Sequence, residues 1–141
     1  MKVKEILSYV KVKVSEYPKM DSIIEGLELR KENEKRKDVN SFIRSKNKVN
    51  KNTEEQVLRN INIDKKIDEY KKWQSLIKNE LEELRIKDND LYKIVIFKIT
   101  GYSFEKIKSE LYLGERTVIN SYNNFIIQIS LLAVKDGLIH I

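Results

Sequence analysis

The sequence predicts an all-α fold, because helix-breaking residues are scarce and apolar residues recur at helical spacing. One proline and four glycines interrupt 141 residues, and no stretch alternates β-branched and polar residues as a strand would. Hydrophobic residues make up 40% of the chain and charged residues 35%, a balance that favours long helices with solvated outer faces. We expect an N-terminal helical hairpin, a long central helix and a C-terminal group of shorter helices.

Residues 1–34 are expected to form the helical hairpin. The first helix should stop before Pro18, whose ring disfavours the α conformation at Tyr17. A second helix can begin there, because proline fits the first turn of a helix. The apolar stripe of the first helix is Val3, Ile6, Leu7, Val10, Val14 and Tyr17, and that of the second is Met20, Ile23, Ile24 and Leu27. The two stripes would together bury a small apolar seam.

Residues 35–52 lose this periodicity and are expected to form a basic linker. Residues 30–51 hold nine Lys/Arg against three Asp/Glu, an excess as large as the net charge of +6. Such a segment can bind a polyanion by releasing counterions from its phosphates, and Lys46, Lys48 and Lys51 are the candidate contacts. A solvated, lysine-rich linker is the alternative, and the sequence favours neither.

Residues 53–87 are expected to form one long helix, with Thr53 as its N-cap and Gln56 closing a capping box. A roughly 34-residue helix would extend about 50 Å at 1.5 Å per residue. The apolar seam of this helix repeats about every 3.5 residues and contains Tyr70, Trp73, Ile77, Leu81 and Leu84. Such a seam favours a homo-oligomer; alternatively, it packs on other helices of the same chain.

Residues 88–141 change to short helices joined by tight turns. One helix should end at Gly101, which can take the left-handed conformation, and Ser103 should cap a second helix from Phe104 to about Leu111. After Tyr112-Leu113-Gly114, the last helix is expected from Glu115 to about Lys135. Its inner face is Val118, Tyr122, Phe125, Ile129 and Leu132.

Two helices separated by about three residues, the second polar at its start, are typical of a helix-turn-helix. In that motif the first helix crosses the DNA backbone and the second presents its N-terminal residues to the major groove. Arginine can bind guanine there and asparagine can bind adenine. The expected DNA-binding residues are Gly114, Glu115, Arg116, Thr117, Asn120, Ser121 and Asn124. The expected partner is therefore double-stranded DNA.

The stretch Tyr102-Ser103-Phe104-Glu105-Lys106-Ile107, followed by Leu111-Tyr112-Leu113-Gly114-Glu115-Arg116-Thr117-Val118, resembles region four of bacterial sigma factors. The whole chain is more similar to the phage late-gene activators of the RinA and ArpU type, although only residues 101–118 are specific. The resemblance implies a DNA-binding activator of phage late transcription in the cytoplasm of a bacterial host cell, with RNA polymerase as a candidate partner. It also implies that Arg116 and Thr117 are the motif's Arg-Thr pair at the DNA-facing start of the recognition helix.

Charge within the C-terminal region leaves other functions open. Residues 88–141 hold six Lys/Arg against six Asp/Glu, and a neutral helix-turn-helix binds DNA weakly alone. The basic linker, dimerisation or a protein partner could compensate. A small terminase-like subunit that recognises DNA for phage packaging, and an interaction module that binds RNA polymerase, are the alternatives to a transcription regulator.

Catalysis is not expected, because the residues that usually carry it are scarce. The chain has no cysteine and a single histidine, His140, so neither a thiolate nor a Ser-His-Asp group is available. We expect no catalytic residue, no metal site and no cofactor. Residues 1–17 alternate lysine with apolar residues, a pattern that fits neither a signal peptide nor a membrane span.

Overall fold

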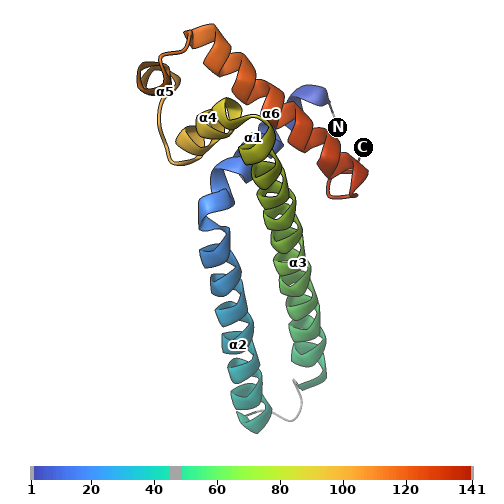
Figure 1. Ribbon diagram of the computed structural model, residues 1–141. Helices are drawn as coiled ribbons and strands as arrows, with labels where there is room; N and C mark the ends of the chain where they lie inside the picture. Colours follow the sequence, from blue (N-terminus) through green and yellow to red (C-terminus); the bar gives the residue numbers. More distant parts are fainter. Residues whose placement is uncertain (1, 45–48, 141) are drawn as a thin grey trace. The chain divides into compact units, whose positions relative to one another are not determined.

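The predicted all-α class is confirmed: helices dominate, and no strand occurs in residues 2–44 and 49–140 (Figure 1). The structure is a computed structural model that describes the backbone of these two ranges and the side chains of residues 2–33 and 54–140. The elements are α1 (Val3–Glu16), the 3₁₀ turn η1 (Tyr17–Lys19), α2 (Met20–Arg44), α3 (Val49–Lys87), α4 (Asn89–Ile99), α5 (Phe104–Leu111) and α6 (Glu115–Lys135).

The N-terminal hairpin predicted for residues 1–34 stays a prediction, and its two helices belong to different units. One unit comprises residues 1–18 and 72–141, and the other comprises residues 19–71. The stripe of α1 is buried at Ile6, Val10 and Val14, as expected, but α1 packs against α6. An amphipathic stripe specifies which face of a helix is buried and leaves its partner open. In the second unit α2 instead runs beside α3 (Figure 1).

The basic linker predicted for residues 35–52 is largely helical. Helix α2 continues to Arg44 and α3 begins at Val49, four residues before the expected N-cap Thr53. Lysine, arginine and glutamate are good helix formers, so a charged segment without an apolar stripe can still extend a helix that is already formed. Residues 45–48, which include Lys46 and Lys48, lie outside the described residues.

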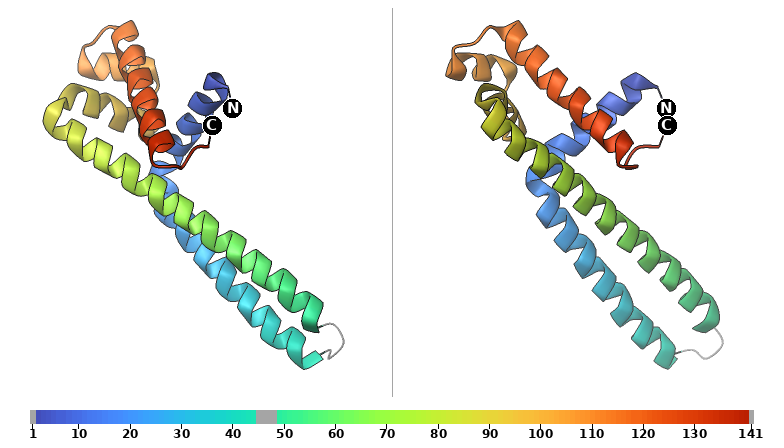
Figure 2. Two further views of the ribbon diagram at one scale, coloured as in Figure 1. Left: turned by 90° about the vertical axis from the view of Figure 1, so that its right-hand side faces the viewer. Right: turned by 45° about the vertical axis from the view of Figure 1, so that its right-hand side comes forward.

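Helix α6 is the centre of the first unit. It packs against α1, α4 and α5, with α5 beside its first turns and α1 crossing its later part (Figure 2). Val118, Tyr122, Phe125 and Ile129 are buried as predicted, while Leu132 is half-buried. Ile126, Ser130 and Ala133 complete this buried face. The Ser130 hydroxyl donates to the Ile126 carbonyl at 2.8 Å, so its burial leaves the hydroxyl satisfied.

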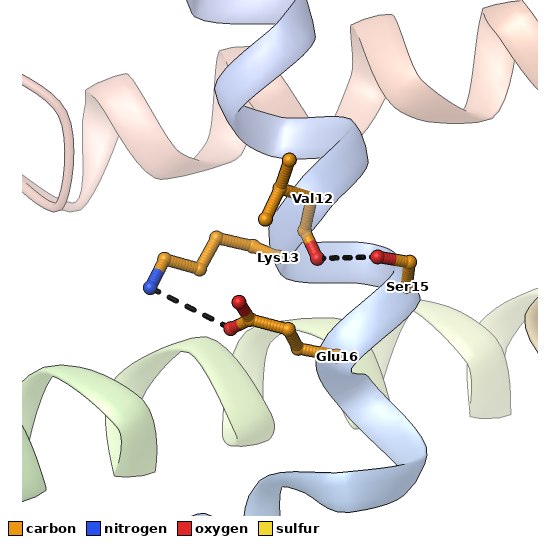
Figure 3. Close-up of polar contacts among 4 residues, drawn as sticks. All are labelled: Val12, Lys13, Ser15 and Glu16. Carbon is orange, nitrogen blue, oxygen red and sulfur yellow. Dashed lines mark hydrogen bonds and ion pairs between the residues drawn. The ribbon is translucent and has the colours of Figure 1, made fainter.

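An aromatic side chain of α1 meets the C-terminal half of α3. The ring of Trp73, 1% exposed, lies edge-on to Tyr9 with centroids 6.0 Å apart. Lys13 Nζ lies 5.4 Å from the centre of the Tyr9 ring and 3.8 Å from Glu16 Oε2. Figure 3 shows this ion pair beside the Ser15 hydroxyl, which donates to the Val12 carbonyl at 2.7 Å.

The seam of the long helix is buried within a single chain. Trp73, Ile77 and Leu81 are all at most 5% exposed. The alternative reading of the seam, packing inside the chain, therefore holds for these residues. Tyr70 and Leu84 are half-buried, and a homo-oligomer stays a prediction.

Trp73→Ala is expected to lower the free energy of unfolding by about 3–5 kcal/mol, because it leaves a large cavity beside Tyr9. Urea unfolding followed by circular dichroism measures this loss. Ile86→Ala is the control, since Ile86 is 81% exposed and its truncation should change stability by less than about 0.5 kcal/mol. Equal losses in the two variants would show that Trp73 does not belong to the core.

Candidate nucleic-acid interface

Helices α5 and α6 form a braced pair on one side of the first unit. Ile107 of α5 and Val118 of α6 are both fully buried. The rings of Phe104 and Tyr122 meet edge to face, with centroids 5.8 Å apart. Burial raises the pKa of the Tyr122 phenol, so this ring stays neutral at physiological pH. The aromatic contact and the two aliphatic anchors fix α5 against the beginning of α6.

The turn between α4 and α5 has the two features that the sequence predicts: a left-handed glycine after α4 and a serine cap before α5. Gly101 takes φ 103°, and the Tyr102 N–H donates to the Phe97 carbonyl at 3.0 Å, a Schellman closure. The rings of Phe97 and Tyr102 stack with centroids 5.0 Å apart, which is the apolar contact that accompanies this closure. Ser103 Oγ accepts from the Lys106 N–H at 3.2 Å and caps α5.

The three-residue turn between α5 and α6 contains a left-handed residue that is not a glycine. Tyr112, and not Gly114, takes the left-handed conformation, with φ 56° and ψ 39°. The Leu113 N–H then donates to the Lys108 carbonyl at 3.3 Å and closes the end of α5. The Tyr112 side chain is 94% exposed, so no packing contact offsets the strain of this backbone conformation.

Most of the predicted DNA-binding residues share one exposed face of α6. By helical spacing, Arg116, Thr117, Asn120 and Asn124 lie on the side opposite the buried residues, and all four are exposed. Ser121 is half-buried at the edge of this face. Glu115 is exposed in the first turn, but its spacing places it on the same side as Val118 and Tyr122. We call Arg116, Thr117, Asn120 and Asn124 the α6 outer face.

The glycine before α6 is not required by its backbone. Gly114 is the N-cap, with φ −67° and ψ 144°, an extended conformation that any residue adopts. A Cβ added there would lie 3.6 Å from Thr117 Oγ1, an ordinary contact distance. The remaining advantage of glycine at this position is that another molecule can approach the backbone closely.

The basic residues predicted to contact phosphates are only partly located. Lys46 and Lys48 lie outside the described residues, and Lys51 lies in α3 with its side chain outside them. Two exposed lysines on α5, Lys106 and Lys108, were missed by the sequence analysis. Lys106 Nζ lies 4.2 Å from the centre of the Tyr102 ring, which holds it close to the α4–α5 turn. Lysines on the helix that precedes a recognition helix are the signal that could have identified them.

Comparisons with protein-family models, with curated proteins and with solved structures found no match for this chain. Within residues 2–44 and 49–140, no helix is long and apolar enough to cross a membrane. Among the side chains of residues 2–33 and 54–140, no cluster of histidine and carboxylate groups is arranged to hold a metal ion.

Tyr112→Gly is expected to be more stable than Tyr112→Ala by about 1 kcal/mol, because only glycine takes the left-handed conformation without strain. Both variants remove the exposed ring, so the difference isolates the backbone. Thermal unfolding measures it. Equal stability of the two variants would mean that the backbone at position 112 leaves the left-handed region.

Gly114→Ser is expected to raise the free energy of unfolding by a few tenths of a kcal/mol, because the new hydroxyl can accept a hydrogen bond from the first turn of α6. Ser103→Gly, which removes the cap of α5, is the matched control and should lower stability by a similar amount. If the backbone at Gly114 approaches a phosphate, the serine variant loses DNA affinity while it gains stability. Retained affinity would remove Gly114 from the interface.

Proposed function

We propose that this chain is a sequence-specific DNA-binding protein that regulates transcription, with α5, the turn and α6 acting as a helix-turn-helix. The observation that carries the proposal is the α6 outer face: four polar side chains are exposed on the first turns of a helix whose other face is buried. A helix anchored in this way can enter the major groove without losing its core contacts.

The chemistry of the α6 outer face suits base edges. The Arg116 guanidinium can donate two hydrogen bonds to guanine, and the amides of Asn120 and Asn124 can pair with adenine. The Thr117 methyl can contact a thymine methyl. Lys106 and Lys108 on α5 are placed on the helix that crosses the DNA backbone in this motif, where they would contact phosphates.

Activation of phage late genes is the specific role we propose, and it rests on the resemblance of residues 101–118 to known activators. A packaging subunit would use the same groove contacts, so the genomic position of the binding site separates the two roles. Recovering protein-bound fragments from host and prophage DNA tests this directly. Fragments upstream of late operons support the regulator, and fragments confined to a packaging site support the terminase-like role.

A protein partner is favoured by one further observation on α6. Beyond Asn124 the outward side of the helix becomes apolar, with Ile127 44% and Leu131 62% exposed. Apolar side chains one turn apart on a solvated helix are suited to a protein contact. RNA polymerase is the candidate partner, because an activator must contact both DNA and polymerase.

Arg116→Ala is expected to weaken binding to the specific site by about 1–3 kcal/mol with little change on random DNA, because a bidentate base contact is lost. Fluorescence anisotropy with both duplexes measures the two affinities. Gln128→Ala is the control, since Gln128 is exposed further along α6. Equal loss on the two DNAs would make Arg116 a phosphate contact, and no loss on either would remove α6 from the groove.

A further inference from the structure

The second unit carries a small basic hollow that lies between its two helices. Arg30 of α2 and Arg59, Asn62, Ile63 and Lys66 of α3 surround a volume of about 170 Å³. Ile63 is 5% exposed and supplies the apolar part of the lining. Three cationic side chains and no acidic one line this hollow, which consists entirely of described residues. We call it the hairpin hollow.

The packing of α2 on α3 holds the hairpin hollow in place. Ile24, Ile63 and Ile67 form a buried cluster, with Leu27 and Tyr70 packed against it. Arg59, Asn62 and Lys66 follow one another at intervals of three and four residues, so they lie along one side of α3. Ile63 belongs to both the cluster and the lining. The helix packing therefore holds the α3 backbone that carries the neighbouring cations.

None of the described carboxylates lines the hairpin hollow, and Arg30 already interacts with another group. Asp64 is held by Lys31, with its Oδ1 atom 2.7 Å from the lysine Nζ. Glu55 and Glu69 lie about one turn from Arg59 and Lys66 along α3, and neither lines the hollow. Within the described part of the chain, neither Arg59 nor Lys66 forms an ion pair with a carboxylate.

A glycine on α2 adds open space on the same side of that helix as Arg30. Gly26 lies one turn before Arg30 and is exposed, and a Cβ added to it would meet no atom within 4 Å. Glycine inside a helix costs about 1 kcal/mol relative to alanine, and no packing contact of the described chain requires it here. The side of α2 next to the hollow is therefore open to an incoming molecule.

We propose that the hairpin hollow is a binding site for a phosphate group of the nucleic-acid backbone. Two guanidinium groups and an ammonium supply only donors and positive charge, and arginine matches the geometry of phosphate oxygens. The Asn62 amide adds a neutral donor, and the apolar side of Ile63 strengthens the charge attraction by excluding water. The identity of the anion as a phosphodiester rests on the proposed DNA-binding function, whereas the site itself rests on the hollow.

The first experiment tests the site without DNA. In the full-length protein labelled with ¹⁵N, inorganic phosphate should shift the side-chain amide of Asn62 and the Nε–H of Arg59 saturably at constant ionic strength. Arg59→Gln with Lys66→Gln should abolish the saturable shift of the Asn62 amide, the reporter that this variant keeps. Lys65→Gln with Lys71→Gln, which removes two exposed cations of α3 outside the hollow, should preserve it. No saturable shift in the wild type, or equal behaviour of both double variants, would overturn the site.

The second experiment tests the ligand. The hollow variant should flatten the slope of log affinity against log salt on duplex DNA by about 0.9, for one lost phosphate contact. Raising salt fourfold would then weaken the wild type about three- to fourfold more than the variant, while the Lys65/Lys71 variant keeps a steeper slope. Phosphate binding with an unchanged DNA slope would overturn the phosphodiester assignment. Phosphate binding by a wild type that binds no DNA would overturn the proposed function and leave the site standing.

Discussion

The rest of the first unit depends on one constraint on α6, which must bury one face along its whole length while the outward side of its first turns stays polar. Val118, Phe125 and Ile129 are at most 2% exposed, and three other helices pack on α6. Because the buried face is shared among α1, α4 and α5, no single contact sets the orientation of the α6 outer face. A surface that discriminates among bases needs this rigidity, since small displacements break bidentate hydrogen bonds.

The local elements of the C-terminal region could be predicted from the sequence because their signals are short-range. Ser103 caps α5 and Gly101 closes α4 through bonds within a few residues, and the period of α6 alone identifies its buried face. Tyr112 could not be predicted, because sequence favours glycine in the left-handed conformation and Gly114 stood two residues away. The turn closes at position 112, where the Leu113 N–H donates to the Lys108 carbonyl directly after α5 ends at Leu111.

Long-range pairing was less predictable than local structure. The stripe of α1 was identified correctly, but its packing partner α6 was not, and the seam around Trp73 and Ile77 fitted a second chain as well as the same one. Hydrophobic periodicity reports that a face is buried and carries no information about what buries it. The hairpin hollow could not be predicted for the same reason, since Arg30 and Arg59 are 29 positions apart in the sequence. Only the pairing of α2 with α3 brings them to one hollow.

Under the proposed function, base discrimination belongs to the first unit, and the hairpin hollow of the second unit adds to the general affinity that Lys106 and Lys108 supply. Residues 88–141 carry no net charge, so the α6 outer face gains little from counterion release and depends on hydrogen bonds to bases. A strongly basic recognition helix would also bind random DNA, and the specific site must exceed random DNA by about 4–10 kcal/mol. Phosphate contacts made by the hairpin hollow raise affinity for all DNA equally. The ratio of the affinities for specific and random DNA then depends on Arg116, Asn120 and Asn124. A neutral recognition region and a basic hairpin are therefore physically compatible in one regulator.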